Sequence, residues 1–108
     1  QVWFAYEEYE KSEELLSKVI RENPLYSRAY SSLAVIRAEQ QRLADSVQLN
    51  LDALSINPMN FRAIYNLAYA LYYGWYEKDA RWFFKRSVEY QPDYAGGLNG
   101  IELTKEQN

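Results

Sequence analysis

The sequence contains no cysteine and no histidine. These absences exclude disulfides, zinc sites built from cysteine and histidine, thiol nucleophiles and imidazole acid–base catalysis. Proline and glycine are scarce, at three and four residues among 108, which favours a helical chain over a loop-rich one. Basic residues are also in deficit, because twelve lysines and arginines face fifteen acidic residues for a net charge of −3. No surface that neutralises the phosphates of DNA or RNA is indicated, so no nucleic-acid partner is predicted.

Apolar side chains are abundant enough for one packed domain. Hydrophobic residues make up 48% of the chain and aromatic residues 17%, with eleven tyrosines. No segment approaches the roughly 18 apolar residues of a membrane helix, so we expect a soluble protein without membrane insertion. The lack of cysteine fits cytoplasm and periplasm equally. Because the chain starts at Gln1 and its one methionine is Met59, we expect it to be a piece of a longer protein.

Three prolines mark an internal repeat, because Pro24, Pro58 and Pro92 lie 34 residues apart. Other positions share this period: a small residue lies twelve positions before each proline, and an apolar residue lies four positions before it. These residues are Ser12, Ser46 and Ala80, and Ile20, Leu54 and Val88. Within each period the apolar residues follow a helical spacing in two segments, which predicts a helix hairpin that ends before the proline.

The repeat resembles the tetratricopeptide repeat (TPR), a 34-residue unit written W-x2-L-G-x2-Y, then A-x3-F, then P. The first half is matched at Tyr30-x2-Leu33-Ala34 and Ile64-x2-Leu67-Ala68-x2-Leu71. The second half is matched at Ser12-x3-Leu16, Ser46-x3-Asn50 and Ala80-x3-Phe84. Departures are Arg37 at the tyrosine site, Asn50 at the phenylalanine site and Gln41 where a turn glycine is usual. The resemblance implies an all-α fold, an alpha-solenoid of antiparallel helix hairpins stacked in a right-handed superhelix.

The resemblance further implies a single TPR domain of about two and a half repeats. Its units are a partial repeat over 1–26, two repeats over 27–60 and 61–94, and a terminal capping helix over 95–108. The helices are predicted near 1–6, 9–23, 27–40, 44–57, 61–74, 77–91 and 95–105. The last of these is expected to be poorly formed, because its three glycines each lower helix propensity by about 1 kcal/mol relative to alanine.

The first turn has an alternative. The segment 2–22 contains neither glycine nor proline, so the half-repeat is also compatible with one straight helix of about twenty residues. A hairpin that is opened in this way favours domain swapping.

The helix near 61–74 carries two distinct faces. Its core face is formed by Ile64, Leu67, Ala68 and Leu71. TPR proteins hold an extended peptide or a partner's helix on the concave side, which the first helix of each unit lines. The resemblance therefore assigns the second face to a ligand groove, together with the equivalent face of the preceding unit. The candidate binding residues are Arg28, Ser31, Val35, Arg62, Tyr65, Asn66, Tyr69, Tyr72 and Tyr73, with Ser32, Ala38 and Glu39 on the same sector.

Tyrosine suits recognition because it offers a large contact area with few rotatable bonds. The alternative is that these tyrosines only stack on neighbouring helices. Arg28 and Arg62 would pair with acidic side chains of a ligand, or with local carboxylates. The lysines and asparagines with which some TPR domains hold a terminal carboxylate are not reproduced here, which disfavours that mode.

A second interface is predicted around Trp82, which lies opposite the core face of the helix near 77–91, and around Trp75 beside the hairpin turn. These residues would contact another subunit, as in a homodimer, or would cover each other. Carboxylates such as Glu13 and Glu14 are expected on solvated faces, so no catalytic residue, metal site or cofactor is predicted. We therefore expect a non-catalytic interaction module that binds a protein or peptide in its groove. The alternative is a scaffold that self-associates through Trp75 and Trp82 or through its repeat ends.

Overall fold

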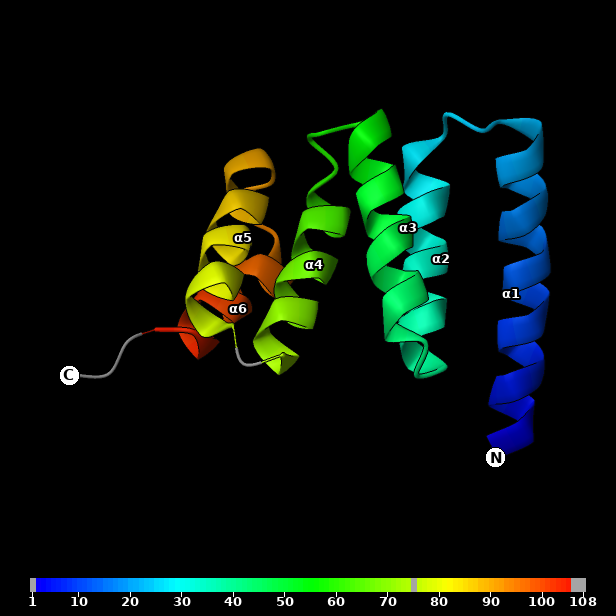
Figure 1. Ribbon diagram of the computed structural model, residues 1–108, viewed down its shortest axis with the longest axis horizontal. Helices are drawn as coiled ribbons and strands as arrows, with labels where there is room; N and C mark the ends of the chain where they lie inside the picture. Colours follow the sequence, from blue (N-terminus) through cyan, green and yellow to red (C-terminus); the bar gives the residue numbers. More distant parts are fainter. Residues whose placement is uncertain (1, 75, 106–108) are drawn as a thin grey trace.

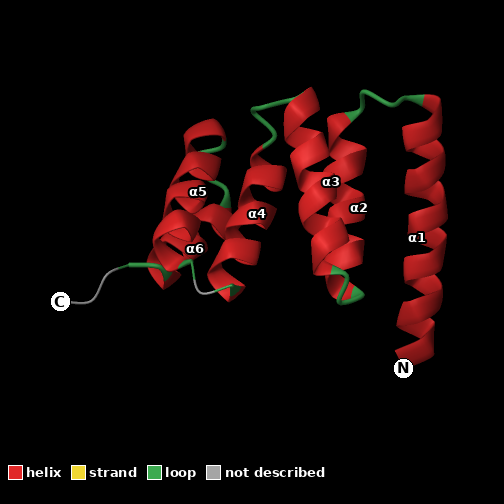
Figure 2. Cartoon of the chain, viewed as in Figure 1, coloured by secondary structure: helices red, strands yellow, loops and turns green. Residues whose placement is uncertain are grey.

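The computed structural model describes the backbone of residues 2–74 and 76–105, and side chains from Glu8 onward within these ranges. The part of the chain so described contains six helices and no strand, which confirms the predicted all-α fold (Figures 1 and 2). The helices are α1 (Val2–Glu22), α2 (Ser27–Glu39), α3 (Leu43–Ile56), α4 (Phe61–Tyr73), α5 (Glu77–Tyr90) and α6 (Ala95–Leu103). From α2 onward, every helix boundary falls within two residues of its predicted position.

The helices form a row of packed hairpins. Helices α2 and α3 pair with each other, as do α4 and α5, while α3 contacts α4 and α6 contacts α5. Figure 1 shows α1 at one end of the row and α5 with α6 at the other. Pro24, Pro58 and Pro92 lie in the turns that follow α1, α3 and α5. A proline has no amide hydrogen for a helix and disfavours helical geometry in the residue before it, which explains where these helices end.

Small residues bring the two helices of each hairpin together. In the α2–α3 hairpin, Ser46 Oγ donates to Ala34 O at 2.8 Å and Ser27 Oγ donates to Ala53 O at 2.7 Å. Because each hydroxyl is bonded to a backbone carbonyl, neither serine is buried with an unsatisfied polar group. The α4–α5 hairpin instead encloses an apolar cluster of Ala68, Ala80 and Phe84, all fully buried. Close approach of the helices therefore has two chemical solutions in successive hairpins.

The predicted break between helices 1–6 and 9–23 is wrong, because α1 runs as a single helix from Val2 to Glu22. This is the alternative that the missing helix breaker allowed. A turn would have interrupted backbone hydrogen bonds without a glycine or proline to favour the required dihedral angles. The first hairpin is consequently open.

The expectation of a poorly formed final helix is also wrong. Helix α6 is regular from Ala95 to Leu103, and its glycines serve close packing. A Cβ atom at Gly97 would lie 2.7 Å from Val88 Cγ1, and one at Gly100 would overlap the ring of Phe84. Both glycines are buried. Tertiary packing thus outweighs the low helix propensity of glycine.

Replacing Gln41 with glycine is expected to stabilise the protein by about 0.5–1 kcal/mol. Gln41 follows the C-cap of α2 and has a φ of 66°, a left-handed conformation in which a Cβ atom is strained. Gln40, with a φ of −86°, provides the matched control, and its change to glycine should destabilise the protein. Urea unfolding midpoints measure both effects, and a loss of stability in Gln41→Gly would contradict the strain argument.

Candidate binding groove

Two exposed stripes run along α2 and α4. On α2 the stripe consists of Arg28, Ser32, Val35 and Glu39, which are all exposed. Successive members are four, three and four residues apart, which places them on one face of a helix. The residues 34 positions later form the same stripe on α4, namely Arg62, Asn66, Tyr69 and Tyr73. The two stripes therefore present equivalent positions of two successive repeats.

A pocket of about 520 Å³ lies between the stripes toward the C-terminal ends of α2 and α4. Val35, Ala38 and Leu43 give it one apolar side, and Tyr69 and Tyr73 belong to the other. We call it the tyrosine pocket. Its remaining lining residues are Glu39, Gln41, Ser46, Asn66 and Ala70. The volume falls within the range of sites that bind small ligands or large side chains.

The two tyrosines of this pocket differ in exposure. Tyr73 is 70% exposed, and its ring stacks on that of Tyr69 with centroids 5.6 Å apart. Tyr69 is half-buried and contacts the ring of Phe84 edge-on, with centroids 5.2 Å apart. The buried phenylalanine therefore fixes Tyr69, and Tyr69 in turn supports Tyr73. A supported, exposed aromatic ring is well suited to binding an apolar group.

Tyr65 and Tyr72 do not line the tyrosine pocket. Tyr65 is half-buried, contacts Tyr94 with centroids 5.1 Å apart, and fills the space above Gly96, where a Cβ atom would lie 2.8 Å from Tyr65 Cε1. Burial, followed by the neighbouring hydroxyl of Tyr69, raises the pKa of Tyr65 well above its ordinary value. Tyr72 is half-buried against Tyr69 and Tyr73. For Tyr65 and Tyr72 the stacking alternative describes the structure.

Ser31 is a correction to the predicted groove set. It is only 2% exposed, and its hydroxyl donates to Arg28 O at 3.1 Å, so it has no surface to offer a ligand. Ser32 takes the exposed place instead. The helical period carried this signal, because Ser32 lies four residues after Arg28 and on the same face. Asn66 is half-buried and donates to Asn50 Oδ1 at 3.1 Å, so its amide has an internal role.

The arginine ends of the stripes line a second pocket of about 520 Å³, which we call the arginine pocket. Among the residues that the structure describes, ion pairs join Glu13 to Arg37, Arg42 to Asp45 and Arg86 to Glu89, so neither Arg28 nor Arg62 takes part in one. Arg62 lies over the ring of Phe61, with Cζ 5.3 Å from the centroid. The other lining residues are Leu25, Tyr26, Ser27, Ile56, Asn57, Met59 and Asn60.

Sequence reasoning missed Leu25 and Met59 at this end. They are 75% and 60% exposed, and each follows a repeat proline, so they occupy equivalent positions of two units. The signal was available in the period, since an apolar residue recurs directly after Pro24 and Pro58. We call the surface from the arginine pocket to the tyrosine pocket the groove.

Comparison with known proteins decides what this arrangement is. The sequence matches no protein-family model and no curated protein. The TPR domain of Arabidopsis OM64 superposes with a TM-score of 0.81 over 97% of this chain and 87% of that domain, at 15% identity. The first TPR of Spaghetti (RPAP3), bound to the HSP90 peptide SRMEEVD, gives 0.79 over 94% and 81%, also at 15% identity. The chain has the TPR fold.

A third TPR structure agrees. The second TPR domain of human RPAP3, in complex with the HSP70 peptide SGPTIEEVD, matches with a TM-score of 0.76 over 97% of this chain and 88% of that domain, at 13% identity. The resemblance expected from the prolines and the small residues is thereby confirmed. In the terms of the TPR fold, α2 and α4 are the first helices of two successive units.

Trp82 lies outside the groove of the TPR array. It is 55% exposed on α5, contacts the ring of Phe83 edge-on, and carries the guanidinium of Arg86 over its ring at 5.3 Å. Trp75, the other half of the predicted second interface, lies outside the described residues. The second interface therefore stays a prediction.

Two further searches concern the described residues only. Within 2–74 and 76–105, no group of three or more aspartate, glutamate, histidine or cysteine residues is placed to hold a metal ion. In the same ranges no helix has both the length and the apolar character needed to cross a bilayer.

Proposed function

We propose that the protein is a non-catalytic interaction module whose groove binds an extended segment of a partner protein. The observation that carries this proposal is the tyrosine pocket, where the stripes of two successive repeats meet around about 520 Å³ of open space. An isolated helix needs one apolar face to pack in a hairpin. Helix α4 has that face in Ile64, Leu67 and Ala68, and still presents Tyr73 on the other side.

The chemistry of the groove varies along its length. The tyrosine pocket suits an apolar side chain, whereas the arginine pocket, with two guanidinium groups, suits a carboxylate. Ser32 and Asn66 lie between them on the stripes and are polar, which suits a passing peptide backbone better than the apolar face of a helix. Seven residues of α4 separate Arg62 from Tyr69, about 10 Å along the axis, or about three residues of extended chain.

The solved structures support the proposal by analogy of fold. Both RPAP3 domains are complexed with peptides, which shows that this arrangement of helices accommodates an extended ligand. Fold alone does not determine function, so the residues of the groove have to carry the specificity.

Linear peptides selected from a phage-displayed random library should bind the groove. We expect Tyr73→Ala and Val35→Glu each to weaken the selected peptides by at least about tenfold, because exposed aromatic and apolar anchors dominate such interfaces. Isothermal titration calorimetry with the synthetic peptides measures the loss. Both side chains are exposed, so thermal unfolding should change little.

Trp82→Ala is the matched control, because Trp82 is an exposed aromatic residue outside the groove. It should leave peptide affinity within about twofold of the wild type, a difference well below 1 kcal/mol. The proposal would be refuted by a selection that enriches no linear peptide. It would equally be refuted if the enriched peptides lost affinity with Trp82→Ala and kept it with Tyr73→Ala and Val35→Glu.

A further inference from the structure

Helix α1 exposes a face that its counterparts bury. The residues at 34-residue offsets in α3 and α5 are Ser46, Asn50 and Ala53, and Ala80, Phe84 and Ser87, and all six are buried. The matching residues of α1 are only half-buried. They are Ser12, Leu16 and Val19. The same positions of the repeat are therefore covered in two helices and open in the third.

The missing hairpin partner explains the difference. In α3 and α5 this face packs on the first helix of the same unit, as Ser46 does on Ala34 and Phe84 on Ala68. The backbone before Tyr9 instead continues α1 in a straight line, so it cannot fold back onto α1. Of the described helices only α2 contacts α1, and Figure 1 shows α1 alone at the end of the array.

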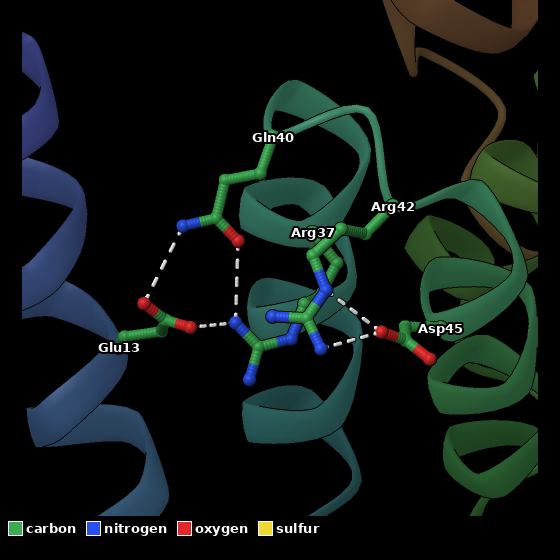
Figure 3. A network of polar contacts seen from close by, with 5 residues as sticks. All are labelled: Glu13, Arg37, Gln40, Arg42 and Asp45. Atoms are coloured by element: carbon green, nitrogen blue, oxygen red, sulfur yellow. Dashed lines mark hydrogen bonds and ion pairs between the residues drawn. The ribbon is translucent and has the colours of Figure 1, made fainter.

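The contact with α2 fixes which side of α1 stays open. Glu13 forms an ion pair with Arg37 and accepts a hydrogen bond from Gln40 Nε2 at 3.4 Å, so this side faces α2 (Figure 3). Leu15 lies about 160° from Glu13 around the helix and is 65% exposed. Together with the half-buried face it forms an apolar stripe with helical spacing, the α1 stripe. Its members are Ser12, Leu15, Leu16 and Val19.

We propose that the α1 stripe binds the α1 helix of a second copy of this chain in antiparallel orientation. In this helix-swapped dimer, each copy supplies the hairpin partner that the other lacks. The interface lies outside the groove, so it is independent of peptide binding. An opened hairpin is a known low-cost route to such exchange, because the same contacts form between chains instead of within one.

The charge pattern of α1 selects a second copy and its direction. Residues 7–14 contain five glutamates and one lysine, whereas residues 15–22 contain Lys18 and Arg21 against one glutamate. An antiparallel pair places the acidic half of each helix beside the basic half of the other. A parallel pair would set the acidic halves against each other, which is unfavourable. The two helices also match in length, at 21 residues or about 31 Å.

Sedimentation velocity at increasing concentration tests for the dimer. The wild type should be dimeric at micromolar concentration, and Leu15→Glu should shift the protein to monomer by weakening association at least tenfold. Leu51→Glu on α3, where the leucine is 47% exposed, is the matched control and should leave the dimer intact. A wild type that stays monomeric at the highest soluble concentration, or a dimer that Leu15→Glu does not affect, would overturn the proposal.

Single cysteines test the direction, because the natural chain has none. Ser12 lies at the middle of α1, so in an antiparallel pair the two copies of position 12 meet at the symmetry axis. Ser12→Cys should therefore form an interchain disulfide, whereas Val19→Cys should not, since its copies would be about 20 Å apart. Equal cross-linking by both variants would indicate a parallel pair and refute the antiparallel arrangement. Peptide binding by Leu15→Glu should remain unchanged, which separates this test from that of the groove.

Discussion

Replacing Gly100 with alanine is expected to lower the free energy of unfolding by about 2 kcal/mol. A Cβ atom at this position would overlap Cγ, Cδ1 and Cε1 of the Phe84 ring. Phe84 is fully buried between α4 and α6, and Tyr65 and Tyr69 pack against its cluster, so the ring has no space into which it can move. Alanine gains about 1 kcal/mol of helix propensity over glycine, but overpacking a tight core costs up to about 3 kcal/mol. The steric effect therefore wins.

A double-mutant cycle with Phe84→Leu checks the cause. Leucine leaves room beside α6, so the loss in the double variant should be smaller than the sum of the two single losses by about 1 kcal/mol or more. Asn99→Ala, at an exposed position of the same helix, controls for helix propensity and should stabilise slightly. Additive losses would show that Gly100 acts through the backbone of α6 instead of through the Phe84 ring.

The fold was predictable because the repeat punctuates the chain at regular intervals. Pro24, Pro58 and Pro92 fixed the hairpin ends, and the small residues before them indicated where helices approach. The two errors concern positions where local preference and packing disagree. Gly97 and Gly100 are poor helix formers, and only the position of Phe84 on another helix reveals why they are needed. Propensity read along one segment cannot contain that information.

The site was predictable as a face of a helix but not in its depth. Helical spacing brought Val35, Tyr69 and Tyr73 together, and the structure places all three on one pocket. The same spacing could not show that Tyr65 turns into the space above Gly96, because this depends on how α6 packs. Ser31 was misassigned because its burial depends on the neighbouring helix as well as on its angle around its own.

The pocket also contains residues that no single helix pattern could supply. Gln41 and Leu43 come from the turn and the start of α3, so their place beside Tyr69 follows from the geometry of a hairpin and its neighbour. Arg37 is a related case. It departs from the TPR pattern, and its function becomes clear only when α1 is seen beside it, with Glu13 facing it (Figure 3).

Replacing Glu13 with glutamine is expected to destabilise the protein by about 2 kcal/mol. The side chains of Arg37 and Glu13 are only 17% and 23% exposed, so the variant would leave a mostly buried guanidinium without its counter-charge. Breaking a fully buried ion pair costs about 3–5 kcal/mol, and an exposed pair is worth at most about 1 kcal/mol. The partial exposure here places the loss between these limits.

The same region offers a matched control, because Arg42 and Asp45 form an ion pair whose side chains are 53% and 50% exposed (Figure 3). Asp45→Asn should change the free energy of unfolding by no more than about 0.5 kcal/mol, since water already solvates both groups. The loss in Glu13→Gln should appear mainly as faster amide hydrogen exchange in α1, which α2 alone holds among the described helices. Equal effects of the two substitutions would mean that burial does not strengthen the Glu13–Arg37 pair. Faster exchange throughout the chain would mean that α1 docking is part of the global folding unit.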